Sequence, residues 1–396
     1  MNETTEQTAM RYLPLAETHR RNGATFTERD GYLCPANYGD ARAEYEAVRG
    51  VAAAGLVDLS ARGRIEVSGA EAVQFLNGLI TNDLKTLAPR AWMHAAFPNV
   101  QGRLLAAVRV ARPGDEIRFL IDTEPATHQK VFKTLERFTL AGDFHVKDVT
   151  AETIQLSLQG SNAHDIIERM GDGSHVQMSP GQAMVVTWPG TQAVIILCEP
   201  HTGDFGFDLI CPAGDAASRL WEALIESGAR PVGSEAFEVL RVEAGVPRYG
   251  VDVDETNVVT EAVREDEAIS YTKGCYIGQE IIARIHWRGH VAKRLAGLVL
   301  EDEGDPGADA KVRTTEGREI GRVTSTVFSP RLGRRIALAV LKYDYLQPGT
   351  QVSVVAGEAV QRAARVASLP FVGGGSHAGG AAAVIGDASG DGEEAT

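Results

Sequence analysis

Residues 273–280, K-G-C-Y-I-G-Q-E, place a cysteine among residue types that make a thiol reactive. Gly274 and Gly278 permit unusual backbone angles and the close approach of a ligand. A Lys273 ammonium near Cys275 would favour the thiolate, which is the nucleophilic and metal-binding form. The loop therefore predicts a catalytic Cys275, assisted by Lys273, that attacks a carbon or sulfur electrophile or ligates iron in transit. The alternative is a turn cysteine without chemical use.

Two pairs of polar residues are further candidates. Asn82 and Asp83 follow an apolar helical stretch, where they could line a cavity or cap a helix. Arg241 and Glu243 lie in L-R-V-E-A-G, whose alternation could place both on one face as a structural ion pair. Each pair therefore has a structural interpretation beside a binding one.

The sequence gives little support for a metal-binding or nucleotide-binding site. His286 and His290 are four residues apart in H-W-R-G-H, but Gly289 makes a helix through them doubtful, so we expect no metal site. The four cysteines form no C-x-x-C pair: Cys34, Cys198, Cys211 and Cys275. Neither a phosphate-binding loop nor a strand-linked G-x-G-x-x-G is present, which disfavours nucleotide binding.

Composition sets the class of protein. The 396 residues suit two or three domains, with 44% hydrophobic and 23% charged residues as in ordinary globular chains. A net charge of -14 opposes a direct nucleic-acid role. We find neither a membrane-length apolar run nor a signal-type stretch, and we expect a cytoplasmic protein without membrane contact.

The order of elements predicts an α+β fold. A strand at 64–68, a helix at 70–79, strands at 104–110 and 117–122 and a helix after Pro125 are followed by a similar series from 153 to 227. Short alternating segments separated by Gly and Pro then indicate a β-barrel. We therefore expect two related α+β units around a central cavity plus a C-terminal β-barrel. The predicted boundaries are 1–54 for an N-terminal segment packed on the binding region, 55–150 and 151–289 for the two units, 290–372 for the barrel and 373–396 for a disordered tail.

Several segments carry a family resemblance. They are P-A-N-Y-G at 35–39, G-L-V-D-L-S-A-R-G at 55–63, L-I-T-N-D-L at 79–84, T-G-D-F-G-F-D-L at 202–209 and L-R-V-E-A-G-V-P-R-Y-G-V-D-V-D-E at 240–255. In this order they resemble the tetrahydrofolate-dependent aminomethyltransferase, the T-protein of glycine cleavage. The resemblance implies a folate cofactor. It places Asp208 where a carboxylate could accept two hydrogen bonds from the pterin, and it implies that Asn82, Asp83, Arg241 and Glu243 lie near the same cavity.

The Cys275 loop resembles the signature of the YgfZ-type branch of this superfamily, and N-V-Q-G-R at 99–103 also looks like that branch. Members of the branch bind folate and support the assembly or repair of iron-sulfur enzymes, including enzymes that modify transfer RNA. The resemblance thus implies iron-sulfur client or assembly proteins as partners.

Departures from the T-protein pattern favour this branch. The positions of the T-protein aspartate pair are Ala106 and Ala107 here, and an expected arginine is Phe237. Because a methyl group cannot accept a proton or stabilise a cation, the usual charge assistance is missing. We therefore expect a folate-binding protein that does not cleave glycine. A folate-dependent aminomethyl- or methyltransferase that uses another acid group is the enzyme alternative, and a scaffold that binds a partner through the barrel is a third.

Overall fold

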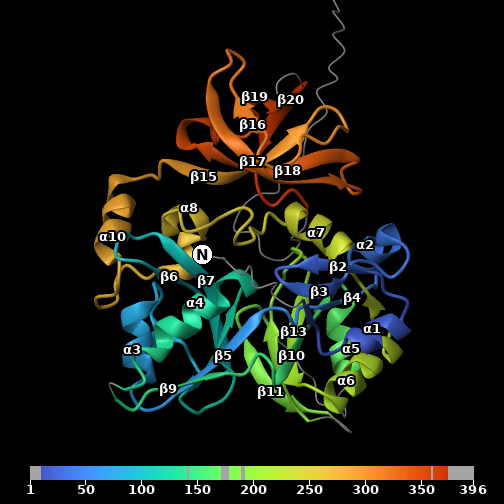
Figure 1. Cartoon of the computed structure of the whole chain (residues 1–396), viewed down its shortest axis with the longest axis vertical. Helices are drawn as coiled ribbons and strands as arrows, with labels where there is room; N and C mark the ends of the chain where they lie inside the picture. Colours follow the sequence, from blue (N-terminus) through green and yellow to red (C-terminus); the bar gives the residue numbers. More distant parts are fainter. Residues whose placement is uncertain (1–9, 141, 171–177, 189–191, 358–359, 373–396) are drawn as a thin grey trace, which may run out of the picture.

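The computed structural model describes residues 10–140, 142–170, 178–188, 192–357 and 360–372. They form a mixed α+β body and a closed six-stranded barrel, which confirms the predicted fold class. In Figure 1 the barrel, in orange and red, lies at one end of the molecule, above the two larger sheets. The predicted tail at 373–396 falls outside the described residues.

The first unit is a five-stranded sheet with helices on one face. Its elements are β5 (Gly63–Ser68), α3 (Ala72–Leu79), a 3-10 helix (Leu84–Thr86), β6 (Ala91–Pro98), β7 (Leu104–Arg112), β8 (Arg118–Thr123), α4 (Pro125–Glu136) and β9 (His145–Asp148). The strands lie in the order β6-β7-β8-β5-β9. Alternate apolar residues of β7, such as Val108 and Val110, pack with Leu76 of α3 and Leu135 of α4. The opposite face of β7 is thereby directed away from the helices.

The second unit repeats this order of elements. It contains β4 (Gly55–Asp58), β10 (Thr153–Gln159), α5 (Ala163–Met170), β11 (Ala183–Thr187), β12 (Ala193–Cys198), β13 (Gly206–Pro212), α6 (Asp215–Glu226) and β14 (Arg230–Pro231). The strand order is β11-β12-β13-β10-β4-β14. Strand β4 comes from the segment that the sequence assigned to the first unit, yet it pairs with β10 and β14 of the second.

The faces that the two sheets turn away from their helices meet at the centre of the molecule. An apolar cluster there combines Trp92 and Leu120 of the first sheet with Leu197 and Ile210 of the second. Because of this contact, both faces of strand β10 are buried. Ile154, Leu156 and Leu158 face the helices, and the polar residues between them face the other sheet and are also buried. The alternating pattern of β10 therefore marks two buried faces rather than one.

The N-terminal segment forms a small sheet and two helices. They are β1 (Arg11–Tyr12), α1 (Ala16–Arg21), β2 (Phe26–Arg29), β3 (Tyr32–Pro35) and α2 (Ala41–Arg49). Helix α2 ends at Arg49, because Gly50 adopts an extended conformation. The Glu44 carboxylate accepts a hydrogen bond from the Gly233 amide over 2.8 Å, which joins this segment to the end of the second unit.

Four helices lead to the barrel: α7 (Ser234–Glu243), α8 (Val259–Ala262), α9 (Glu265–Ala268) and α10 (Gln279–Arg288). The barrel consists of β15 (Lys293–Leu300), β16 (Lys311–Arg313), β17 (Glu319–Ser329), β18 (Arg334–Lys342), a 3-10 helix (Tyr343–Tyr345), β19 (Gln351–Ala356) and β20 (Val360–Ala367). Helix α7 contacts β17 and β18. Among the described helices, none is both long enough and apolar enough to cross a membrane.

Candidate functional site

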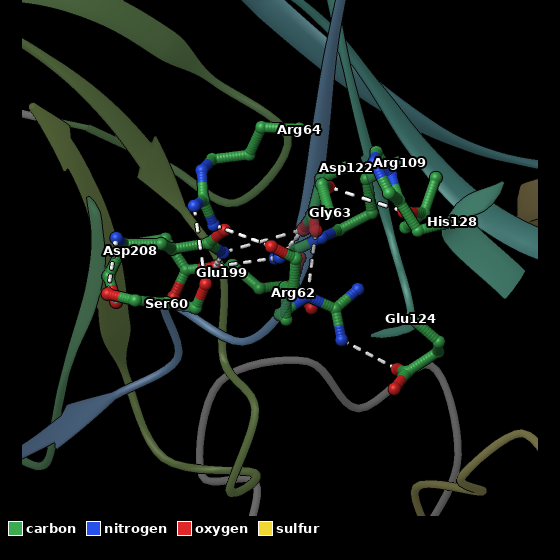
Figure 2. Close-up of polar contacts among 12 residues, drawn as sticks. Ser60, Arg62, Gly63, Arg64, Arg109, Asp122, Glu124, His128, Glu199 and Asp208 are labelled. Carbon is green, nitrogen blue, oxygen red and sulfur yellow. Dashed lines mark hydrogen bonds and ion pairs between the residues drawn. The ribbon is translucent and has the colours of Figure 1, made fainter. Parts of the chain in front are cut away.

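A buried cluster of charged residues lies where the two sheets meet. Arg109 of β7 forms ion pairs with Asp122 of β8 and, over 2.8 Å, with Asp208 of β13. His201 Nε2 lies 2.9 Å from Asp208 Oδ2, and the Gln155 amide donates to the same oxygen over 3.0 Å. Figure 2 shows part of this cluster, with Arg109, Asp122 and Asp208 labelled. Residues of both units thus share one network.

The network keeps its carboxylates ionised. Burial alone would raise the pKa of Asp208, but the His201 imidazole and the Arg109 guanidinium outweigh it and hold that pKa far below its usual value. Burial likewise opposes ionisation of Asp122, and Arg109 and Arg62 overcome it, so the pKa of Asp122 is also lowered. Two buried carboxylates therefore stay charged because two guanidinium groups and an imidazole surround them.

Asp208 was predicted to bind the pterin directly. Its side chain is fully buried, and both oxygens lie within hydrogen-bond distance of other side chains. Within the described structure Asp208 therefore holds Arg109 and His201 in place. Arg62 closes the other end of the network, donating to Asp122 over 2.7 Å and to Glu124 over 2.6 Å (Figure 2).

His94 lies where this network meets solvent. It stands opposite Arg109 in the antiparallel pairing of β6 and β7, so the two side chains share a face of the sheet. The His94 and Glu267 side chains are each 38% exposed, with Nε2 and Oε2 4.0 Å apart. The Asn82 amide donates to the backbone carbonyls of both residues, each over 2.8 Å. Asn82 therefore fixes the backbone on both sides of this pair.

Some buried polar atoms of the network have no hydrogen-bond partner within the described part of the chain. They include Nε of Arg109, Oε1 of Gln155 and Oε2 of Glu199. Glu199 Oε2 lies 3.8 Å from the Arg109 guanidinium, an ionic contact that leaves its hydrogen-bonding capacity unused. A carboxylate oxygen of this kind is suited to a donor group on a ligand.

The Cys275 loop is anchored by its lysine. The Lys273 ammonium donates to the carbonyl oxygens of Asn82, over 2.6 Å, and Ile80, over 2.9 Å, and lies 3.4 Å from the Asn77 side-chain oxygen. Burial lowers the pKa of Lys273 to about 8, with Asp83 acting in the opposite direction. Cys275 itself is exposed. Lys273 thus fastens the loop to the end of α3, while the thiol faces solvent.

Asp83 has the structural role that the sequence left open. Its carboxylate accepts from the Lys85 amide over 3.0 Å at the start of the 3-10 helix, and from the Asn77 amide over 3.0 Å. Asp83 therefore caps this short helix, beside Asn82 and Lys273. The structure brings these three predicted site residues together.

The predicted ion pair between Arg241 and Glu243 is wrong. Both lie at the end of helix α7, not in an alternating strand, and each has its own partners. Arg241 donates to Asp252 over 2.8 Å and to Ser325 of the barrel over 2.7 Å. Glu243 accepts from Tyr45 over 2.9 Å, and its partners Arg49 and Ser329 lie in α2 and β17. The two residues hold α7 against the barrel, apart from the Asp208 network.

The segment of His286 and His290 agrees with expectation, because helix α10 includes His286 but ends at Arg288, with Gly289 in a left-handed conformation as its C-cap, so that no helix runs through both histidines. The His286 ring stacks on Tyr271 at 3.8 Å between centroids, and the His290 ring stacks on Tyr343 at 4.4 Å. A surface hollow of about 490 Å³ lies elsewhere, on the barrel beside Gln351 and Gln361. None of the seven predicted site residues lines this hollow.

Sequence patterns did not identify His94, Arg109, Asp122, Glu199 or His201. Arg109 and Asp122 carry one local signal, a charged residue inside an apolar strand, as for Arg109 in L-L-A-A-V-R-V. Such a residue is almost always paired when it is buried. The pairing itself depends on the contact between two sheets, which no local pattern specifies.

Comparisons with known proteins match nearly the whole chain. Residues 15–264 match the GCVT N-terminal domain and residues 293–373 match the glycine cleavage T-protein C-terminal barrel domain. An aminomethyltransferase from Geobacillus kaustophilus is 32% identical over 364 residues, which cover 90% of this chain and 97% of the relative. An aminomethyltransferase from Desulforamulus reducens is 29% identical over 365 residues, with the same coverage of 90% and 97%.

The fold agrees with these matches. The crystal structure of glycine cleavage system aminomethyltransferase T from Bartonella henselae superposes with a TM-score of 0.83 at 26% identity, and the match covers 92% of this chain and 98% of that one. The YgfZ-type assignment stays a prediction. From both of its domain matches and from the identity along its length, the chain belongs to the glycine cleavage T-protein family.

Proposed function

We propose that the protein binds tetrahydrofolate and transfers a one-carbon group to or from it, as a folate-dependent transferase of the aminomethyltransferase type. The observation that carries this proposal is the likeness to aminomethyltransferases along 90% of the chain, at up to 32% identity. The buried network at the contact between the sheets supports it, because residues from both units converge there with unused hydrogen-bonding capacity.

The donors and acceptors of this network fit a folate. A pterin offers an amino group and a ring N–H as donors, and Glu199 has a buried oxygen without a hydrogen-bond partner in the described structure. Glu199 would hold the pterin, while Asp208 would keep Arg109 and His201 in place around it. Bound tetrahydrofolate would supply a nucleophilic nitrogen, N5, for the one-carbon group.

Calorimetry with tetrahydrofolate tests the binding. Glu199→Gln should weaken the affinity by roughly 10-fold or more, because it removes a charge-assisted hydrogen bond worth about 1.5–3 kcal/mol. The exposed Glu303 is a matched control, and Glu303→Gln should bind as the wild type does. An affinity unchanged in Glu199→Gln would remove Glu199 from the site, and a wild-type chain that binds no folate would refute the proposal.

The transfer itself can be measured in reverse. Ammonium and a thiol, for which dihydrolipoamide is a suitable probe, should convert 5,10-methylenetetrahydrofolate to tetrahydrofolate in the presence of the protein. Binding of folate without any turnover in this assay would argue against a transferase.

A second candidate function is the support of iron-sulfur enzymes in the manner of YgfZ-type proteins. The observation that favours it is the exposed Cys275, on a loop that the buried Lys273 anchors to the end of α3. An exposed thiol on a fixed loop can reach a partner protein. The alanines at 106 and 107, where the resemblance expects aspartates, support the same candidate.

A further inference from the structure

We propose that His94 is the proton acceptor of the transfer reaction, taking up the proton that N5 of tetrahydrofolate loses as it bonds to the one-carbon group. The inference rests on the proposed function and adds a catalytic residue to it. It starts from the missing carboxylates, because a transferase with alanines at 106 and 107 needs another base.

The strand register places His94 beside one of these alanines. Ala107 pairs with Ala96, and Arg109 pairs with His94, so all four side chains project from one face of the sheet. His94 is therefore diagonal to Ala107, at a separation of about 7–8 Å between backbone positions, which an aromatic side chain can span. Ala106 projects from the other face into the core, where it is fully buried. Of the two alanines, Ala107 is the one on the face of the polar network.

Exposure separates His94 from the rest of the network. The side chains of Arg109 and Asp208 are 5% and 0% exposed, whereas His94 is 38% exposed. A base must meet its substrate at one end and release its proton to solvent at the other. Among the described titratable side chains around Arg109, Arg62, Glu199 and His201 are 11–15% exposed, whereas His94 and its neighbour Glu267 are each 38% exposed.

The surroundings keep the imidazole neutral. Burial lowers the pKa of His94, Arg109 and His201 lower it further, and Glu199 and Glu267 act in the opposite direction. The net direction is downward, so the imidazole is unprotonated at neutral pH and can accept a proton. No hydrogen bond joins it to another described side chain, and its closest ionic contact is Glu267 at 4.0 Å. Asn82 fixes its backbone carbonyl, which limits how far the ring can move.

The transfer step balances with His94 as the base. The donor carries the one-carbon group on a sulfur atom, which leaves as a thiolate. A bond forms between N5 and the carbon, and the bond from that carbon to the donor heteroatom breaks, with its electron pair leaving on the heteroatom. His94 Nε2 takes the proton released by N5. In the reverse direction the thiol attacks the carbon, and the imidazole passes the proton that the thiol loses to N5 as the bond between N5 and the carbon breaks. N10 takes up the proton that ammonium loses when its nitrogen bonds to the same carbon.

His94→Gln tests this role, with His145→Gln as the matched control on exposed strand β9. In the reverse assay with 5,10-methylenetetrahydrofolate, ammonium and dihydrolipoamide, His94→Gln should lower kcat by roughly 100-fold or more, while tetrahydrofolate affinity changes less than threefold. The wild-type rate should fall as the pH rises through the His94 pKa, because the reverse reaction needs the imidazolium. This limb of the pH profile should be absent in His94→Gln and present in His145→Gln.

A readout independent of turnover is the NMR signal of the His94 ring. Adding 5-formyltetrahydrofolate should shift this signal and change its pKa, and should leave the His145 signal unchanged. If His94→Gln keeps a third or more of the wild-type kcat, and its rate falls over the same pH range as that of the wild type, His94 is not the base. The proposed transferase function would then still stand. A wild-type chain that binds folate but shows no turnover, or binds no folate, would overturn the proposed transfer together with the role of His94.

Discussion

Lys273 and Asn82 are joined by a hydrogen bond of 2.6 Å from the lysine ammonium to the asparagine backbone carbonyl. The Asn82 side chain in turn donates to the carbonyls of His94 and Glu267. Two residues that the sequence assigned to separate roles, one catalytic and one in cofactor binding, therefore form one connection. It runs from the loop of the exposed Cys275 to the edge of the Arg109 network.

Lys273→Met should destabilise the fold by about 1–3 kcal/mol at pH 7, because two buried carbonyls lose their donor. The pKa of Lys273 falls from 10.5 to about 8 on folding. Between these values the unfolded chain binds more protons, so the wild type should gain stability over the variant as the pH rises from about 8 to 10.5. Urea unfolding of both proteins at several pH values measures this difference. A difference that shrinks over this range would contradict the assignment.

Asp208→Asn should destabilise the protein by about 3–5 kcal/mol at neutral pH, since it leaves the buried Arg109 without one of its charged partners. Because the folded-state pKa of Asp208 is lowered, its stabilising contribution is present above the unfolded value of 3.8 and is lost as the pH falls through the folded value. The gap between wild type and variant should therefore narrow below about pH 4. Thermal unfolding measures it, and the exposed Asp344→Asn serves as the control.

Arg241→Met should loosen the barrel from α7. The substitution leaves the fully buried Asp252 without its guanidinium partner, at a cost of about 3–5 kcal/mol. Amide hydrogen exchange should accelerate around Ser325, whose hydroxyl accepts from Arg241. Exchange in the strands of the first unit should change less. Uniform acceleration throughout the chain would show that Arg241 stabilises the whole fold rather than this contact.

Cys275→Ser should leave both the stability and the tetrahydrofolate affinity of the protein unchanged, because the thiol is exposed. If the second candidate function holds, this variant should fail to restore iron-sulfur enzyme activity in cells that lack the protein. Full rescue by Cys275→Ser would exclude a role for the thiol, and normal turnover in the folate assay would show that the transferase does not need it.

Local sequence patterns predicted helices and strands well where the spacing of apolar residues clearly fits one type of element. The alternating segment at 64–68 was expected as a strand and is β5, Gly63–Ser68. The short segments after residue 290 form the predicted barrel. Around Arg241 the pattern failed, because L-R-V-E is too short to separate a strand from the last turn of a helix. The preceding residues, which extend helix α7 back to Ser234, decide the structure.

The candidate site was predicted only in part, for a physical reason. Asn82, Asp83 and Lys273 come together because a loop folds back onto the end of α3. Asp208 meets Arg109 through the packing of one sheet on another, at a separation of 99 residues in the chain, from 109 to 208. Long-range contacts of this kind follow from tertiary packing, and the spacing of residue types does not encode them.

Strand β4 makes the two halves of the body inseparable. Its residues Gly55–Asp58 are synthesised before the first unit, yet they fill the place between β10 and β14. A fragment that begins at residue 151 would lack an interior strand and expose two unpaired backbone edges, which invites aggregation. During translation, about 100 further residues must be synthesised after Leu56 of β4 before its pairing partner Leu158 of β10 is available. A folding intermediate with a complete first sheet and an incomplete second one is the expected consequence.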